Sequence, residues 1–137
     1  MGKKQTRHEA RIIAFGLIFQ KQFNDEEPQF LFEQTLEEYP ESKENSEYIK
    51  TAFFGVLEKE KEICDIIAAH LGTKWRIDRI SKVSLAVMKL AVFEMKYIDD
   101  VPVKAAINEA VEIEKTFDEP DNSAFVNGVL GSICREL

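Results

Sequence analysis

Residues that could support catalysis are few in this chain of 137 residues, and they lie scattered along it. His8 and His70 are far apart, and neither has a partner at the two-ligand spacing of a metal-binding helix. The glycine-rich phosphate-binding motifs and the serine-nucleophile motif are absent from the sequence. Glu109 and Glu112 could place two carboxylates on one helix face, but Lys115 follows at the same spacing, which favours a solvated face. The sequence therefore predicts a protein that is not an enzyme and that needs neither a cofactor nor a metal ion.

Positive charge gathers at the N-terminus, where it could bind phosphate groups. Five basic residues against one acidic residue give residues 1–22 a charge of +4. Arg7 and Arg11 are one helical turn apart, His8 can add a hydrogen-bond donor, and Lys3 and Lys4 can follow from a flexible lead-in. Because cations at a helix N-terminus oppose the helix dipole, this placement favours a binding role over a merely solvated helix end.

The rest of the chain is acidic. Its 13 basic and 24 acidic residues sum to −11, which leaves a net charge of −7 and a sequence pI near 4.9 for the whole molecule. Such a charge disfavours a general binder of nucleic acids or membrane surfaces. A polyanion is therefore expected to approach one end only.

The spacing of apolar residues predicts a single all-α domain over residues 1–137, a compact bundle of about six or seven helices. Thr6 and Glu9 fit the capping box and start the first helix, whose apolar face carries Ile12, Phe15 and Phe19. Arg7, Arg11 and Ile18 fall on a different face, directed away from the core. Further helices are expected at 28–39, at 46–71 as one long helix ending before Gly72, at 81–98, at 103–117 and from residue 121 onward, with a polar loop at 41–45.

Cysteine usage and the start of the chain predict a cytoplasmic protein. Cys64 and Cys134 are 70 positions apart, without a CxxC motif, and are expected to be buried free thiols. The chain begins with a charged segment, and no apolar run approaches the ~20 residues that a membrane span requires. We therefore expect no membrane association.

The 10 phenylalanines are expected to form core, with one position less certain. Phe125 lies in the first turn of the last helix, where an aromatic ring could stack an unpaired base beside the preceding loop. By position alone, the core is the better interpretation for Phe125.

Two C-terminal segments, VPVKAAINEAVEI at 101–113 and FVNGVL at 125–130, resemble the signature of the NusB family of bacterial transcription antitermination factors. Supporting motifs are Ala10-Arg11 with Ala14 and Leu17, the segment AVMKLA at 86–91, and Phe93-Glu94. The resemblance covers essentially the whole chain and is weakest between Asn24 and Ser46. It also implies the all-helical bundle that the apolar spacing predicts.

The resemblance implies a factor that binds the single-stranded boxA element of ribosomal RNA leaders together with NusE, a ribosomal protein of the small subunit. Other antitermination factors and RNA polymerase would be engaged indirectly. The family's basic N-terminal arm maps onto Lys3, Lys4, Arg7, His8 and Arg11, its first-helix aromatic onto Phe19, and its acidic and aromatic pair onto Asp121 and Phe125. The resemblance thus reverses the core interpretation of Phe125.

This chain departs from the family pattern at two places. Glu9 follows Arg7-His8 where relatives often have consecutive arginines, so RNA affinity without a partner is expected to be weak. Phe19 stands where tyrosine is common, which keeps stacking but loses a hydroxyl group. An acidic protein with a reduced basic arm is expected to need a basic partner, such as NusE, to hold RNA firmly.

Two alternatives to this function remain open from the sequence. One is a helical protein–protein interaction module without RNA specificity. The other is a stand-alone relative of the NusB-like domain of RNA methyltransferases, although 137 residues leave no room for the methyltransferase domain itself. The sequence leaves both a monomer and a homodimer open, because phenylalanine-rich helices permit either.

Overall fold

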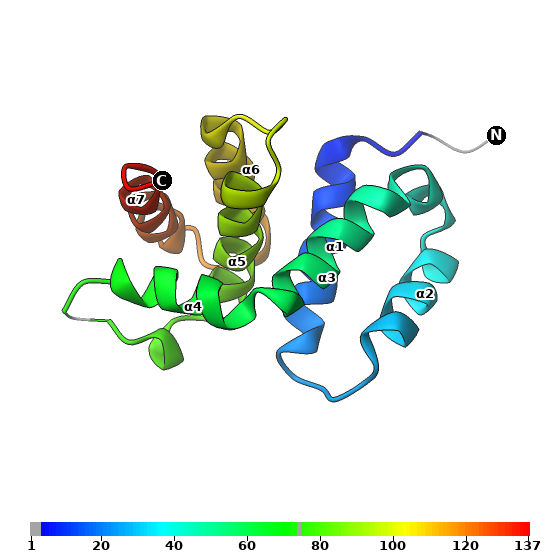
Figure 1. Ribbon diagram of the computed structural model, residues 1–137, viewed down its shortest axis with the longest axis horizontal. Helices are drawn as coiled ribbons and strands as arrows, with labels where there is room; N and C mark the ends of the chain where they lie inside the picture. The colour runs from blue at the N-terminus through cyan, green and yellow to red at the C-terminus, as the bar shows by residue number, and fades with distance from the viewer. Residues whose placement is uncertain (1–3, 74) are drawn as a thin grey trace. The chain divides into compact units, whose positions relative to one another are not determined.

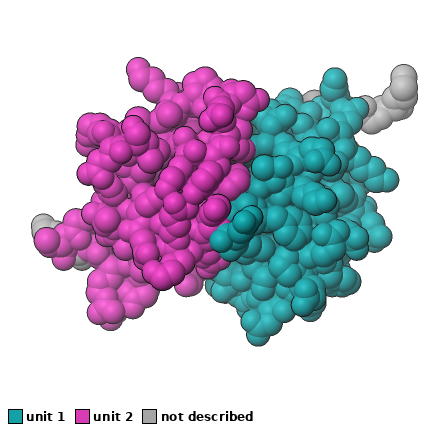
Figure 2. Space-filling view, in the orientation of Figure 1, with its two compact units in different colours: residues 1–58 teal, residues 59–137 magenta. Residues whose placement is uncertain are grey.

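The computed structural model describes residues 4–73 and 75–137, and within these ranges the chain is helical and contains no strand (Figure 1). Seven α-helices and two 3-10 helices follow one another as α1 (Arg7–Lys21), α2 (Pro28–Glu38), η1 (Pro40–Asn45), α3 (Ser46–Glu58), α4 (Glu60–Ala69), η2 (Ile77–Arg79), α5 (Lys82–Tyr97), α6 (Val103–Phe117) and α7 (Asn122–Cys134). The predicted all-α class is confirmed. The chain divides into two compact units, residues 1–58 and residues 59–137 (Figure 2).

The first unit is built on α1, which packs against α2, η1 and α3. Small and aliphatic side chains of α1, including Ala10, Ala14 and Leu17, are completely buried, and Phe53 of α3 is completely buried as well. The predicted orientation of α1 is wrong in part, because Arg11 and Ile18 are buried while Ile12 and Phe19 are only half-buried. A helix with apolar residues on several faces leaves the choice of its buried face to the helices that pack on it.

The N-terminus of α1 is held by the predicted capping box. The amide of Glu9 donates to Thr6 Oγ1 at 3.1 Å, and the amide of Thr6 donates to the Glu9 carboxylate at 2.8 Å. These two bonds satisfy backbone donors that the first helical turn would otherwise leave unpaired.

We expect Thr6→Ala to lower the free energy of unfolding by about 1 kcal/mol, because it leaves the Glu9 amide without its side-chain acceptor. Urea unfolding followed by circular dichroism measures the change. Thr51→Ala, at an exposed position in the middle of α3, is the matched control and is expected to change stability little. Equal stability of Thr6→Ala and the wild type would show that the cap does not hold the first turn.

The single long helix predicted at 46–71 is wrong, because α3 ends at Glu58 and α4 begins at Glu60. Lys59 between them has φ −102° and ψ 17°, outside the helical range. Apolar side chains of α3, such as Phe53, belong to the first unit, whereas those of α4, such as Ile63, belong to the second. No proline or glycine marks the break, so the periodic pattern runs through it. The helix ends at Ala69, two residues before the predicted end at 71, and Gly72 just beyond it has the positive φ of 80° that glycine favours.

The second unit is built around α5, which packs against α4, α6 and α7. Every residue of α5 from Ser84 to Glu94 is buried, as expected for a helix that is apolar on all sides. Within the described ranges, no helix combines the length and the apolar character that crossing a membrane would require. Cys64 and Cys134 are free thiols as predicted, but both are half-buried rather than buried.

Candidate functional site

The basic N-terminal residues are held in place by the first unit. Gln5 is buried, donates to Ser42 Oγ of η1 at 2.8 Å and accepts from Asn45 Nδ2 at 3.0 Å. The flexible lead-in that the sequence predicts is therefore fixed at residue 5, immediately after the exposed Lys4. Lys3 lies outside the described residues.

Arg7 and Arg11 share one aromatic surface, the ring of Tyr48 in α3. The Arg7 guanidinium lies 4.4 Å from the ring centroid and the Arg11 guanidinium 5.7 Å from it, both within cation–π range. Arg7 is exposed, whereas Arg11 is 8% exposed and His8 is half-buried. The prediction that the face carrying Arg11 points away from the core is thus wrong. The exposed cations here are Lys4 and Arg7.

Phe19 lies at the other end of α1 from this basic group. It is half-buried between Phe15 and Phe23, with ring centroids 6.0 Å and 5.0 Å away. Phe23 is 60% exposed. The structure therefore groups Phe19 with other aromatic rings and not with Arg7 or Arg11, which lie two or more turns earlier in the same helix.

The start of α7 carries the remaining two predicted site residues. Asp121 is exposed and occupies the N-cap position without a side-chain capping bond, so its carboxylate keeps its acceptor oxygens. Phe125 is half-buried, and its ring lies 5.5 Å from the ring of Trp75. Trp75, which the sequence analysis did not select, is 51% exposed. A tryptophan outside any periodic apolar pattern was the signal that could have found it.

A network of buried and half-buried side chains positions this end of α7. Ser81 caps α5 by accepting from the Ser84 amide, and its hydroxyl donates to Asp118 Oδ2 at 2.6 Å. Asn122 Nδ2 donates to the same oxygen at 3.2 Å, and Ser84 donates to Glu114 Oε1 at 2.7 Å. The network thus joins the end of α6 both to the start of α5 and to the first residue of α7.

The two carboxyl groups of this network have opposite pKa shifts. Burial raises the pKa of Glu114 to about 7, assisted by neighbouring Asp118 and opposed by the bond from Ser84. Burial also raises the pKa of Asp118, but hydrogen bonds from Ser81 and Glu114 outweigh that effect and lower it to about 2. The pair therefore holds one proton, on Glu114, across the acidic range, where the protonated carboxyl can donate to the Asp118 carboxylate.

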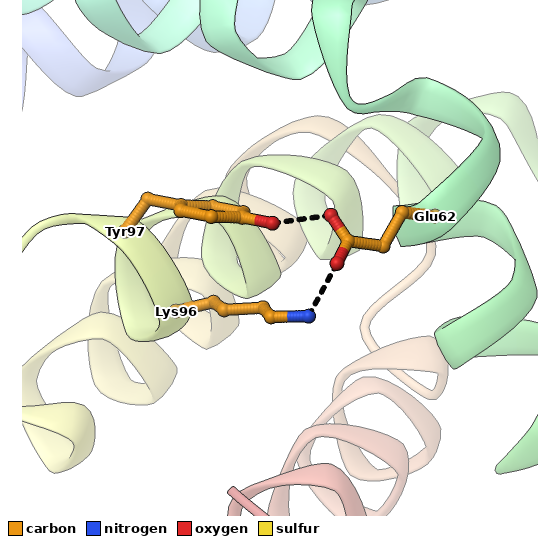
Figure 3. Close-up of polar contacts among 3 residues, drawn as sticks. All are labelled: Glu62, Lys96 and Tyr97. Atoms are coloured by element: carbon orange, nitrogen blue, oxygen red, sulfur yellow. Dashed lines mark hydrogen bonds and ion pairs between the residues drawn. The ribbon is translucent and has the colours of Figure 1, made fainter.

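A second cluster of titratable groups joins α4 to the end of α5. Figure 3 shows the Glu62 carboxylate accepting from the ammonium of Lys96, at 2.5 Å, and from the hydroxyl of Tyr97. The bond from Lys96 lowers the pKa of Glu62, and the bonds to Glu62 raise the pKa of Lys96 and of Tyr97. Each shift moves the group's pKa further from neutrality, so the cluster is a structural contact and not an acid–base pair.

The two carboxylates that the sequence placed on one face of α6 differ in exposure, because Glu109 is half-buried. Glu112 is exposed, and its carboxylate lies 3.9 Å from the ammonium of Lys115. In the ranges that the structure describes, no three His, Cys, Asp or Glu side chains are grouped so that they could hold a metal ion.

Comparison with known proteins gives a consistent result over nearly the whole chain. The model of the NusB family matches residues 8–135. Transcription antitermination protein NusB of Lactiplantibacillus plantarum is 39% identical over 132 residues, which cover 95% of each chain. The NusB protein of Acetivibrio thermocellus is 36% identical, over 98% of this chain and 90% of the relative.

Solved structures show the same similarity in three dimensions. NusB of T. maritima superposes with a TM-score of 0.89 at 32% identity, over 98% of this chain and 94% of that one. A structure of the antitermination factors NusB and NusE in complex with dsRNA superposes with a TM-score of 0.86 at 27% identity, over 96% and 97% of the two chains. This chain therefore belongs to the NusB family.

Proposed function

We propose that this chain is a transcription antitermination factor that binds the single-stranded boxA element of ribosomal RNA leaders together with NusE. Membership of the NusB family supports the proposal, as do relatives of nearly equal length that carry the antitermination name. The complex of a related NusB with NusE and dsRNA supports NusE as the partner and RNA as the class of ligand, whereas a single-stranded ligand is what the family resemblance implies. We take the whole chain, residues 1–137, as one RNA-binding domain that acts in the cytoplasm and catalyses no reaction.

The observation that carries this proposal is the exposed positive charge at the N-terminal end of an acidic chain. Lys4 and Arg7 are exposed on the first unit, and Gln5 between them is fixed by two hydrogen bonds. Cations held at fixed positions lose little conformational freedom when they bind phosphates. Lys4 and Arg7 therefore contact the RNA backbone, and Lys3, His8 and Arg11 complete the basic arm.

The residues at the start of α7 supply the base contacts. The half-buried ring of Phe125 stacks a base, which adds affinity without strong sequence preference. The exposed carboxylate of Asp121 accepts hydrogen bonds from base amino groups, which phosphate-binding residues cannot do. Phe19 adds an aromatic contact from α1.

NusE is required because the remainder of the chain repels RNA. Residues after position 22 carry a net charge of −11, so most of the surface is unfavourable for a polyanion. A basic ribosomal protein on that acidic surface would reverse the sign of the local field and extend the RNA-binding surface.

A three-way binding assay tests the function. The full chain, NusE and a boxA oligonucleotide are compared with the same mixture containing a scrambled RNA and with one containing a duplex of the boxA sequence. We expect tight binding only to single-stranded boxA and only when both proteins are present. Equal binding of boxA and scrambled RNA, with NusE still captured, would identify a protein-interaction module instead.

We expect Arg7→Ala to weaken boxA binding by about 10-fold and to reduce the slope of log K against log salt by about one phosphate contact. The physical reason is the loss of one charged hydrogen bond and of the counterion release that accompanies it. Fluorescence anisotropy over a series of salt concentrations measures both quantities. Lys50→Ala removes an exposed cation from α3 of the same unit and is expected to leave the slope unchanged. An unchanged slope in Arg7→Ala would exclude Arg7 as a phosphate contact.

A further inference from the structure

We propose that Trp75 and the basic segment that follows it, residues 75–82, form a second RNA contact, in which Trp75 and Phe125 bind one unpaired base between them, face-on at one ring and edge-on at the other. The inference rests on the proposed function and extends it to residues that neither the sequence motifs nor the family resemblance selects. The ligand is a single-stranded segment of the same RNA.

The first support is the aromatic pair itself. The rings of Trp75 and Phe125 lie 5.5 Å apart with an interplanar angle of 53°, although 49 residues separate them in the sequence. Trp75 is 51% exposed, so half of the largest aromatic side chain in the chain faces water. Phe125 is only half-buried. Because the two ring planes differ by 53°, a base that stacks on one ring meets the other ring at its edge, so the pair offers two contacts to a base where Phe125 alone offers one.

The second support is local charge. Residues 75–82 contain Arg76, Arg79 and Lys82 against Asp78 alone, a net charge of +2 within a unit of net charge −3. All three cations are exposed. Arg76 is partly neutralised by Asp78, with Nε and a carboxylate oxygen 3.3 Å apart. A cationic segment beside exposed aromatic rings is the combination that single-strand binding sites use.

The third support is that the segment is held at both ends of its short 3-10 helix, η2. Trp75 precedes η2 and contacts Phe125, whereas Ile80, directly after η2, is buried. Ser81 donates to Asp118, which also accepts from Asn122 at the start of α7. The segment and the first turn of α7 are thus tied to one half-buried carboxylate, that of Asp118, which holds the elements that carry the two aromatic rings together before RNA binds.

The single tryptophan gives the experiment a direct readout. The full chain is labelled with 5-fluorotryptophan, mixed with NusE, and titrated with boxA RNA while its one ¹⁹F resonance is followed. We expect the resonance to shift with single-stranded boxA and to stay in place with a duplex of the same sequence. A base that stacks on Phe125 alone would also move the resonance of the adjacent tryptophan, so the substitutions of Trp75 decide whether its ring contacts the base.

Substitutions provide the second arm of the experiment. We expect Trp75→Ala to weaken boxA binding by roughly 5- to 100-fold, the range for loss of one base–aromatic stack, and Trp75→Phe to keep most of the affinity. Arg79→Ala is expected to lower the salt slope by about one phosphate contact. Lys104→Ala, an exposed cation in the first turn of α6 of the same unit, is the control and should leave the slope unchanged.

The two hypotheses fail in different ways. If the wild-type chain with NusE does not bind boxA at all, the proposed function is wrong, and this inference falls with it. If the wild type binds boxA, but the ¹⁹F resonance does not move and Trp75→Ala and Trp75→Phe both bind like the wild type, only the second contact is wrong. Thermal unfolding of each variant separates loss of binding from loss of fold, and the salt slope of Arg79→Ala tests the second contact if Trp75→Ala does not fold.

Discussion

Replacing Arg7 and Phe125 together with alanine is expected to weaken boxA binding in the presence of NusE by roughly 50- to 1,000-fold. This fold-change in affinity combines the loss of one charged phosphate contact by Arg7 with the loss of one base stack by Phe125. The two residues lie in different units and share no partner, since Arg7 rests on Tyr48 and Phe125 on Trp75. Their effects on the binding free energy should therefore add.

The measurement is a fluorescence anisotropy titration of labelled boxA RNA, run with each single variant and with the double variant. The control is Lys50→Ala combined with Lys104→Ala, which removes one exposed cation from each unit and is expected to bind RNA nearly as well as the wild type. The prediction fails if the double variant loses no more affinity than Arg7→Ala alone, because Phe125 would then make no contact with RNA. Arg11→Ala is the poorer choice of test because Arg11 is 8% exposed, so its removal would disturb packing as well as binding.

The second prediction with a large expected effect concerns how the free energy of unfolding depends on pH. The pKa of Glu114 is raised to about 7 in the folded chain, from a value of 4.5 without that environment, so the folded state holds a proton that the unfolded state has already released. Its contribution to stability is fully present below pH 4.5 and is lost as the pH rises through 7. The loss should reach roughly 3 kcal/mol in the free energy of unfolding.

Glu114→Gln is expected to remove this dependence. A neutral amide can accept from Ser84 and donate to Asp118 at any pH, so the variant should be more stable than the wild type at pH 8 and similar to it near pH 4.5. Urea midpoints measured for both proteins between pH 4.5 and pH 8.5 report the difference. Glu112→Gln, an exposed site on the same helix, should follow the wild-type curve. Parallel curves for the wild type and Glu114→Gln would mean that Glu114 is ionised in the folded chain throughout.

The contribution of Asp118 to stability is expected to depend on pH in the opposite direction to that of Glu114. Its pKa is lowered to about 2, so it stabilises the fold above its ordinary value of 3.8 and loses that contribution as the pH falls through 2. The two carboxyls therefore favour the folded state most strongly in the mildly acidic range. Because both belong to the network that positions the start of α7, the same pH range should give the most ordered Phe125.

Local signals in the sequence were enough to predict where most of the helices begin. The capping box at Thr6 and Glu9, the proline at the first position of α2 and Gly72 after α4 all lie where the structure has them. Each acts through hydrogen bonds or backbone angles within a few residues, so the sequence alone contains the physical cause. The resemblance to the NusB family was equally readable, because it rests on contiguous motifs.

Contacts between segments distant in the sequence decided the features that local signals did not predict. The apolar spacing at 46–71 continues through Lys59, and only the separate cores of the two units show why α3 and α4 are distinct helices. Arg11 was expected on a solvated face, but the Tyr48 ring from α3 lies beside it and it is buried. The periodicity of a helix fixes the angle between its side chains around the helix axis. It does not determine which neighbouring helix will cover them.

By itself the sequence therefore determined the all-α class, the starts of most helices, the concentration of positive charge at the N-terminus and the family. The tertiary structure alone decided that Lys4 and Arg7 are the exposed cations among the described residues of the arm, that Trp75 lies against Phe125, and that Glu114 and Asp118 share one network. The physical reason is the distance along the sequence between the residues that interact. Helix formation and capping depend on residues within about one turn. Exposure, ring contacts and pKa shifts depend instead on side chains brought together from positions 30 to 50 residues apart, as in the pairs Ser84–Glu114 and Trp75–Phe125.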